Sequence, residues 1–307
     1  MTTSHMSAER KVRGLLLANE PMARHSSWRC GGPARRYFEP DDREDLLSFV
    51  IAQQLTHEVL WVGLGSNLLV RDGGLDETVV ATPRLNSMRW ETPELLYAEC
   101  GVPCARLARE AAAKDRGGLE FLAGIPGTVG GALTMNAGAL GSETWEFIES
   151  VDMLDEAGSQ VTLLASDFSA CYRGVRGAVG WFLGARFKLP VSAGGHGPAR
   201  IREVLAQRSA TQPTGQASCG SVFKNPPGDF AGRLIELSGL KGTRCGGCKV
   251  SERHANFIVN DCAATAADIE TLINQIIDAV REKTGITLET EVRIVGNYRS
   301  DDPENPA

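Results

Sequence analysis

The chain has 307 residues, enough for two or three domains around separate cores. Its formal charge of −6 at pH 7 excludes a general affinity for nucleic acid or anionic membranes, which requires a basic face, but allows a local basic pocket for one phosphorylated ligand. No run approaches the roughly 20 apolar residues that span a bilayer. Because the N-terminus also lacks the apolar core of a secretory signal, we expect a soluble, cytoplasmic protein.

The N-terminal half predicts a lead-in helix followed by a strand-rich domain. Residues 1–25 contain a helical pattern over 9–20. From about residue 28 to 190, the chain alternates short strand patterns with glycine turns and two helices. Strands are expected over 59–64, 68–70, 78–82 and 95–100, a helix over 103–116, and a hairpin over 151–164. We place this domain at residues 26–192.

The C-terminal half begins after a glycine-rich linker near 192–198 and predicts a second domain over residues 198–298. A helix is expected first, over 199–210. The clearest helix spans 265–285, where leucine, isoleucine and valine recur at helical spacing; this stripe predicts a core helix without chemistry. A strand is expected over 287–296, and residues 299–307 have the composition of a disordered tail.

Two glycine-rich loops fall within the first domain: Gly63–Asn67, and Ala123–Gly131 followed by Met135–Gly138. Glycine lets backbone N–H groups crowd around phosphate oxygens. Neither loop is a Rossmann fingerprint, since Leu68 stands where the third glycine should be, and there is no Walker A sequence. One such loop is as consistent with a structural turn. Two in one domain favour a nucleotide pyrophosphate, without indicating which nucleotide.

An ordered series of motifs resembles the UDP-N-acetylenolpyruvoylglucosamine reductases (MurB type). SSWRCGGPARRYFEP, GLGSNLLVRDGG and LEFLAGIPGTVGGALTMNAGALGSE are similar to the FAD-binding half of that family; CGSVFKNPPGDFAGRLIELSGLKG, VSERHANFIVN and LETEVRIVG are similar to its C-terminal half. The resemblance covers roughly residues 26–296. It implies an α+β fold: a two-subdomain FAD-binding fold of the p-cresol methylhydroxylase/vanillyl-alcohol oxidase type, followed by a C-terminal α+β substrate domain. That fold would explain the failed Rossmann test.

The resemblance also implies the reaction and its cofactors. NADPH would reduce FAD, and the reduced flavin would reduce the enolpyruvyl group of UDP-N-acetyl-3-O-(1-carboxyvinyl)-glucosamine to give UDP-N-acetylmuramate for peptidoglycan. The two small molecules are the expected partners, with no obligate protein partner evident. Carried onto the glycine loops, the family's FAD contacts are expected at Gly63, Gly65, Ser66, Asn67, Gly124, Ile125, Pro126, Gly127, Gly130, Gly131, Asn136 and Gly138.

Three catalytic residues follow from motif positions. Ser221 would donate the proton, Arg173 would hold the substrate carboxylate, and Glu291 would support the same intermediate. From the residues alone, Ser221 fits a backbone hydrogen bond in a turn. Arg173 is likewise one of many surface arginines, and Glu291 fits the solvent face of a strand. Only the resemblance groups them.

Substrate contacts are carried over to Tyr172, Asn225 and His254, although a lone histidine before a strand is more often structural. Two departures from the family pattern stand out. Only seven residues separate Arg173 from Trp181, which places the chain in a shorter-loop subgroup and leaves open what covers the substrate. Gly174 also occupies the position just after Arg173 where a serine is usual.

Alternatives remain at this point. The pairs Cys245/Cys248 and Cys100/Cys104 have spacings found in zinc and redox sites, but free thiols are favoured, and no metal is expected. A flavin oxidase of an alcohol or sugar would share the FAD-domain architecture, but the C-terminal motifs disfavour it. A nucleotide-sugar-binding protein without activity is disfavoured by the presence of all three catalytic residues.

Overall fold

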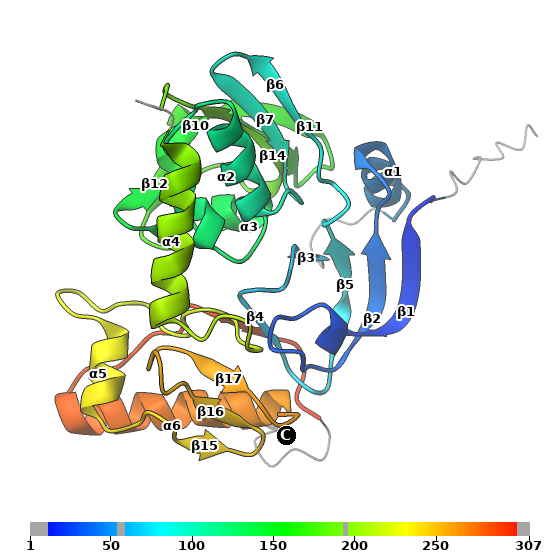
Figure 1. Cartoon of the computed structure of the whole chain (residues 1–307). Coiled ribbons are helices and arrows are strands. Elements are labelled where there is room, and N and C mark those ends of the chain that lie inside the picture. Colours follow the sequence, from blue (N-terminus) through cyan, green and yellow to red (C-terminus); the bar gives the residue numbers. More distant parts are fainter. Residues whose placement is uncertain (1–11, 54–58, 193–195, 300–307) are drawn as a thin grey trace, which may run out of the picture.

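The computed structural model describes residues 12–53, 59–192 and 196–299, which form three packed parts (Figure 1). In the first part, a four-stranded mixed sheet has the spatial order β1 (Leu15–Pro21), β2 (Pro33–Glu39), β5 (Leu75–Ala81) and β3 (Val59–Val62), with the helix α1 (Arg43–Gln53). β1 is antiparallel to β2, whereas β5 is parallel to both β2 and β3. The strands predicted at 59–64 and 78–82 are confirmed.

The helix predicted over residues 9–20 is wrong where the structure describes it. Residues 15–21 form β1, which pairs with β2 from Leu15 opposite Glu39 to Pro21 opposite Pro33; a short 3-10 turn, η1 (Met22–Arg24), follows. An isolated helix of a dozen residues is marginal in water, so ladder pairing and the packing of Leu17 on the core beneath the sheet override local propensity. Residues 1–11 of the prediction lie outside the described residues.

The second part is a five-stranded antiparallel sheet with helices on one face. Its spatial order is β11 (Gln160–Leu164), β10 (Ile148–Asp155), β14 (Gly180–Lys188), β7 (Leu95–Glu99) and β6 (Met88–Thr92). The hairpin predicted over 151–164 and the helix predicted over 103–116 are present as β10–β11 and α2 (Cys104–Ala113). The smaller elements of this second part are η2 (Glu120–Gly124), α3 (Val129–Thr134), β8 (Gly138–Ala139), β9 (Ser142–Glu143), η3 (Thr144–Phe147), η4 (Ala165–Asp167), β12 (Ser169–Cys171) and β13 (Gly174–Arg176).

The third part packs the helix α6 (Ala266–Thr284) against a small sheet of β15 (Arg244–Cys245), β16 (Cys248–Val250) and β17 (Ile258–Asn260), with α5 (Ala231–Leu237) beside it (Figure 1). The core stripe predicted for α6 is confirmed, because its isoleucines at 269, 273 and 276 are buried. Thr265 and Asp268 form a reciprocal capping box, and Gly285 ends the helix at φ 75°. Among the described residues, no helix is both long and apolar enough to cross a bilayer.

Two segments tie the third part to the others. α4 (Gly197–Thr211), predicted over 199–210, runs from beside η2 and α2 down to the third part (Figure 1). At the end of the chain, β18 (Arg293–Val295) pairs in parallel with β4 (Leu68–Val70) of the first part. The strand predicted over 287–296 is therefore only three residues long. The residues before it, 289–292, instead bond to the backbone of residues 222 and 224.

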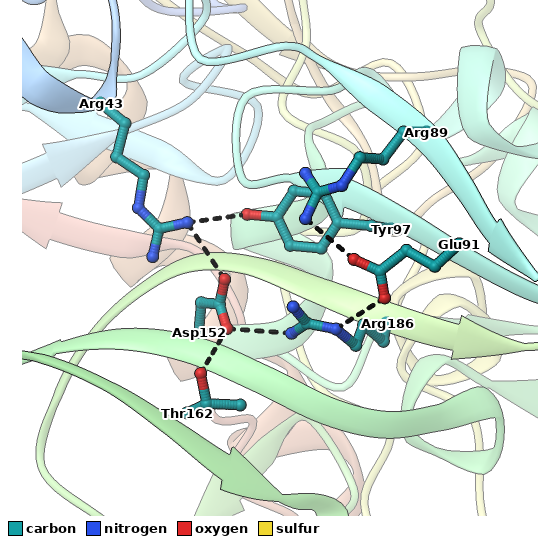
Figure 2. Close-up of polar contacts among 7 residues, drawn as sticks. All are labelled: Arg43, Arg89, Glu91, Tyr97, Asp152, Thr162 and Arg186. Atoms are coloured by element: carbon teal, nitrogen blue, oxygen red, sulfur yellow. Dashed lines mark hydrogen bonds and ion pairs between the residues drawn. The ribbon is translucent and has the colours of Figure 1, made fainter.

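A polar network around the buried Asp152 joins the first two parts (Figure 2). Asp152 of β10 accepts a hydrogen bond on Oδ2 from Arg43 of α1 (3.0 Å). Its Oδ1 accepts two more, from Arg186 of β14 (3.0 Å) and from the hydroxyl of Thr162 (2.8 Å). Arg43 also donates to the Tyr97 hydroxyl at 3.0 Å. The network fixes α1 against the five-stranded sheet.

Candidate active site

A cleft of about 570 Å³ lies where the three parts meet, within the range of small-molecule and cofactor sites. The first part contributes β3 and the loop 63–67. The second contributes residues 125–139 and parts of β14, together with Arg173. From the third part and its connection come α4, the segment 219–221, and Glu291. Residues that are more than 200 positions apart in the chain therefore share one surface.

The two glycine-rich loops face each other across this cleft. Ser66 Oγ donates a 2.8 Å hydrogen bond to the carbonyl of Pro126, which joins the loops. Gly63 is needed because a Cβ there would lie 2.5 Å from Thr128 Oγ1. Within the described residues, the backbone N–H groups of Ser66, Asn67, Gly127 and Thr128 have no intramolecular acceptor. Unpartnered N–H groups lining a cleft are a site for phosphate oxygens.

Ten of the twelve predicted cofactor-binding residues line the cleft: Gly63, Gly65, Ser66, Asn67, Ile125, Pro126, Gly127, Gly130, Gly131 and Gly138. Gly124 does not; it allows α4 to approach, because a Cβ there would lie 2.5 Å from Cδ of Arg208. Asn136 is fully buried, and its side chain donates to Glu143 Oε2 (2.6 Å) and to the carbonyl of Cys171 (3.2 Å). Asn136 thus supports the segment that carries Arg173.

The Arg173 and Glu291 side chains meet at one end of the cleft. Arg173 Nε lies 2.8 Å from Glu291 Oε1, an ion pair without hydrogen-bond alignment, and both side chains are mostly buried. Burial raises the pKa of Glu291 above its ordinary value, while the nearby Arg173 opposes that shift. The Arg173 backbone has φ 57°, a left-handed conformation that costs energy in a non-glycine residue. The fold therefore holds this guanidinium in place against local strain.

Ser221 lies at the same end of the cleft, and the segment that carries it is clamped by its neighbours. The N–H of Val222 donates to the carbonyl of Asn256 (2.9 Å), and the N–H of Glu291 donates to the carbonyl of Val222 (2.7 Å). Asn256 also bonds both backbone groups of Phe223 through its side chain. Within the described residues, the Ser221 hydroxyl has no hydrogen-bond partner, so it is available to a ligand.

The side chain of Asn67 connects the loops to the catalytic end. The side-chain Nδ2 donates to the backbone carbonyl of Glu291 at 3.1 Å. The backbone carbonyl of Asn67 accepts from the N–H of Arg293 at 3.1 Å. The first part of the molecule therefore directly positions the segment that carries Glu291. All three residues predicted as catalytic are thus brought together, although their spacing in the chain gives no sign of it.

The three predicted substrate-binding residues do not line the cleft. Tyr172 is 48% exposed, and its hydroxyl accepts a hydrogen bond from the N–H of Asn225 at 3.2 Å, so these two lie together beside Arg173. His254 instead packs edge-on against Phe257, and its Nδ1 accepts from the N–H of Asn256. Burial lowers the pKa of His254, which favours the neutral ring. A substrate contact by His254 stays a prediction; its observed contacts are structural.

The sequence reasoning missed several polar residues that line the cleft. Arg208 of α4 and Gln212, the residue that caps the end of this helix, line it, and burial lowers the pKa of Arg208. Arg293 also lines it, two residues after Glu291. The alternation of an extended segment places residues i and i+2 on one face, and this could have revealed Arg293. Nothing in the sequence around Arg208 indicates that α4 docks on the loop at Gly124.

Comparisons with known proteins agree on one family. Residues 212–295 match the model described as the C-terminal domain of UDP-N-acetylenolpyruvoylglucosamine reductase, and residues 34–164 match an FAD binding domain. The reductase of Methylococcus capsulatus is 53% identical over 94% of this chain and 95% of its own length. The reductase of Alkalilimnicola ehrlichii is 50% identical over 96% of this chain and 100% of its own length. This chain belongs to the UDP-N-acetylenolpyruvoylglucosamine reductase family.

A solved structure supports the same assignment. The Thermus caldophilus UDP-N-acetylenolpyruvylglucosamine reductase superposes with a TM-score of 0.78 at 31% identity, covering 92% of this chain and 98% of that one. The predicted fold class is confirmed: an FAD-binding unit of two subdomains, here the first two parts, precedes the reductase C-terminal domain. The two parts meet along the glycine loops.

The residues of the cleft fit the FAD that this reductase family uses. Four unpartnered backbone N–H groups offer donors to a diphosphate. At Gly131, a Cβ would meet nothing within 4 Å, which marks the open side of the second loop.

The cysteine pairs contribute no comparable site. Cys100, Cys104 and Cys248 belong to three different core clusters, and no group of three possible ligands that could hold a metal ion occurs in the part of the chain that the structure describes.

Proposed function

We propose that this chain is the NADPH-dependent, FAD-containing reductase that converts UDP-N-acetyl-3-O-(1-carboxyvinyl)-glucosamine into UDP-N-acetylmuramate during peptidoglycan synthesis. The observation that carries the proposal is the convergence of Arg173, Glu291 and Ser221 at one end of a cleft lined by two glycine loops. The chain is an oxidoreductase acting on a carbon–carbon double bond, and the cytoplasm, where nucleotide sugars and NADPH occur, is its proposed location.

The cofactor supplies the redox chemistry and the chain supplies position and charge. Held by the two glycine loops, FAD would supply the transfer of hydride from NADPH to the terminal vinyl carbon of the substrate. Arg173 binds the carboxylate attached to that double bond. As negative charge develops on the carboxylate during reduction, the guanidinium stabilises it more strongly than in the ground state, which lowers the barrier.

Ser221 then supplies the proton to the carbon that carries the carboxylate. A serine hydroxyl is a weak acid, so it is effective only against a strongly basic carbon held close to it in a fixed geometry. The backbone clamp from Asn256 and Glu291 provides that geometry. Glu291, whose pKa is raised by burial, is proposed to balance the charge of Arg173 and support the same intermediate.

The substrate is proposed to extend from the catalytic end toward Tyr172 and Asn225, which touch each other beside Arg173. Both are exposed enough to meet a ligand. In this short-loop chain, Tyr172 adjoins Arg173 on the short β12–β13 hairpin and is therefore a candidate cover for the sugar. His254 is the weakest of the three proposals because its observed contacts are internal.

The alternative of a flavin oxidase shares only the FAD-binding half. Residues 212–295 match the reductase C-terminal domain, and that domain contributes Ser221 and Glu291. An oxidase would re-oxidise its flavin rapidly with oxygen and would not need the UDP-sugar for that step.

The two half-reactions test the proposal directly. We expect the purified chain to be yellow, to be bleached anaerobically by NADPH, and to regain its colour when the enolpyruvyl UDP-sugar is added. Stopped-flow absorbance in the flavin band follows both steps, with UDP-N-acetylglucosamine as the control that lacks the double bond. Re-oxidation by air but not by the substrate would favour the oxidase, and a chain that binds no FAD would refute the proposal.

A further inference from the structure

Two tryptophans from different parts of the molecule stack beside the cofactor cleft. Trp61 lies on β3 of the first part and Trp181 on β14 of the second; their ring centroids are 5.3 Å apart, with an interplanar angle of 25°. Both residues line the cleft, and both are only partly buried. No step of the proposed reaction uses them.

The first glycine loop connects Trp61 at its start to the segment of Glu291 at its end. Trp61 precedes the loop by two residues and packs on the apolar cluster that joins the first two parts, which includes Leu154 and Leu183. Asn67 ends the loop and is bonded to the segment of Glu291. Along the chain, the loop that offers N–H groups to a diphosphate therefore lies between Trp61 and the residue that bonds to the Glu291 segment.

This order matches the order of groups in a flavin adenine dinucleotide. Its reactive ring must lie at Arg173, Ser221 and Glu291, and its diphosphate fits the glycine loops, so its adenine extends to the other side. We propose that Trp61 and Trp181 form the binding site for the adenine ring of the flavin dinucleotide. The inference rests on the proposed FAD-dependent function and adds the residues that distinguish a dinucleotide from a mononucleotide.

The chemistry of the surrounding wall suits a neutral aromatic base. Cys100 and Cys104 line the same cleft, and burial raises the pKa of each thiol to about 12, so both are neutral. Trp61 Nε1 has no hydrogen-bond partner within the described residues, so the fold makes no polar use of this indole. Stacking of a base on an aromatic side chain contributes about 1–3 kcal/mol and requires only an accessible ring face.

Paired affinities for FAD and FMN test the proposal, because FMN lacks the adenine. The full-length chain would be stripped of flavin and titrated with each, following the quenching of flavin fluorescence. We expect Trp61→Leu and Trp181→Leu to raise the Kd for FAD by about tenfold and to leave the Kd for FMN unchanged. Trp61→Phe, which keeps a stacking face, should recover most of the FAD affinity. Trp90→Leu is the matched control, since Trp90 lies on the edge strand β6 outside the cleft.

The outcomes separate this proposal from its rivals. A parallel loss of FAD and FMN affinity would overturn it, because the pair would then only hold the two parts together. Unchanged FAD affinity would also overturn it, as would a higher KM for NADPH without any change in FAD binding. Retained FMN binding reports that a variant is folded. A wild-type chain that binds neither flavin would count against the proposed function itself.

Discussion

Two buried or mostly buried carboxylates in this protein, Asp152 and Glu291, each lie beside arginines but differ in how completely their oxygens are hydrogen-bonded. In the network of Figure 2, Asp152 has partners on both oxygens: Arg43 on Oδ2, and Thr162 and Arg186 on Oδ1. Glu291 forms an ion pair with Arg173 at an angle that gives no aligned hydrogen bond, and Lys224 acts on it only through its charge. Asp152, which helps to hold the parts together, is thus hydrogen-bonded on both oxygens, whereas Glu291 has no aligned hydrogen bond to its arginine and keeps capacity for a ligand.

The pKa shifts express the same difference. Burial alone would raise the pKa of Asp152, yet hydrogen bonds from Thr162, Arg186 and Arg43 lower it below its ordinary value. For Glu291, burial prevails over Arg173 and the pKa is raised. The network therefore keeps its carboxylate ionised, whereas the catalytic carboxyl takes up a proton more readily. Four changes test the different roles of these charged groups and of Ser221 beside them.

The largest effect is expected from Ser221→Ala. Loss of a positioned proton donor costs about 10²–10⁴-fold in rate, and the loss should fall on flavin re-oxidation by the UDP-sugar. Reduction by NADPH should remain at the wild-type rate, because that step needs no proton from Ser221. Rapid-mixing measurements of each half-reaction check this. Ser218→Ala, outside the cleft lining, is the control; equal losses in both half-reactions would point to a folding or FAD-binding defect.

Next comes Arg173→Met, which removes the charge that stabilises the developing anion. We expect kcat to fall by about 10²–10³-fold with the flavin still bound. Arg173→Lys should recover only part of the rate, since an ammonium cannot make the two-point contact of a guanidinium with a carboxylate. Steady-state kinetics on holoenzyme of equal flavin content measure this. A change in KM alone, with kcat preserved, would contradict a role in the transition state.

Asp152→Asn tests the other member of the comparison. Breaking this buried, hydrogen-bonded ion pair leaves Arg43 without its anion and Arg186 with Glu91 alone, and we expect a loss of about 3 kcal/mol in the free energy of unfolding. Because the folded pKa is depressed, the wild type should lose this contribution as pH falls through that pKa, and the variant should show a flatter acid limb. Urea unfolding at pH 7 and at acidic pH measures both.

The matched control is Asp278→Asn, which removes an exposed pair with Arg281. Surface pairs contribute about 0–1 kcal/mol, so little change is expected. If both variants lost the same stability, the network of Figure 2 would have no special role in joining the first two parts.

How far the sequence predicts this molecule depends on the range of the interactions involved. α6 was predictable because its stripe, its capping box at Thr265 and its Gly285 stop are local. β1 was not, because Leu15–Pro21 becomes a strand only by pairing with residues 33–39. The composition of the two glycine loops predicts phosphate binding, and 10 of 12 predicted cofactor-binding residues reach the cleft.

The catalytic residues required more than local pattern. Arg173 and Glu291 are far apart in the chain and meet through the return of the chain along β4, and only the family resemblance grouped them beforehand. Asn136 was predicted as a cofactor contact and is instead a buried support for the Arg173 segment, since the loop turns it inward at φ 40°. Arg208 reaches the cleft only because α4 packs against the loop at Gly124, and no local sequence pattern predicts that packing.

The smallest predicted effect concerns the protonation of Glu291. Its raised pKa means that it takes up a proton at a higher pH than an ordinary glutamate. Protonation removes the counter-ion of Arg173 and leaves the guanidinium free for the substrate carboxylate. The Kd of the UDP-sugar for the oxidised holoenzyme should therefore fall by about threefold as pH is lowered through this pKa, comparable to a partly screened ion pair. Glu291→Gln, which mimics the protonated form, should bind tightly without that pH dependence, as measured by flavin difference absorbance. Tighter wild-type binding at higher pH would show that the carboxylate, not its protonated form, prepares Arg173 for the substrate.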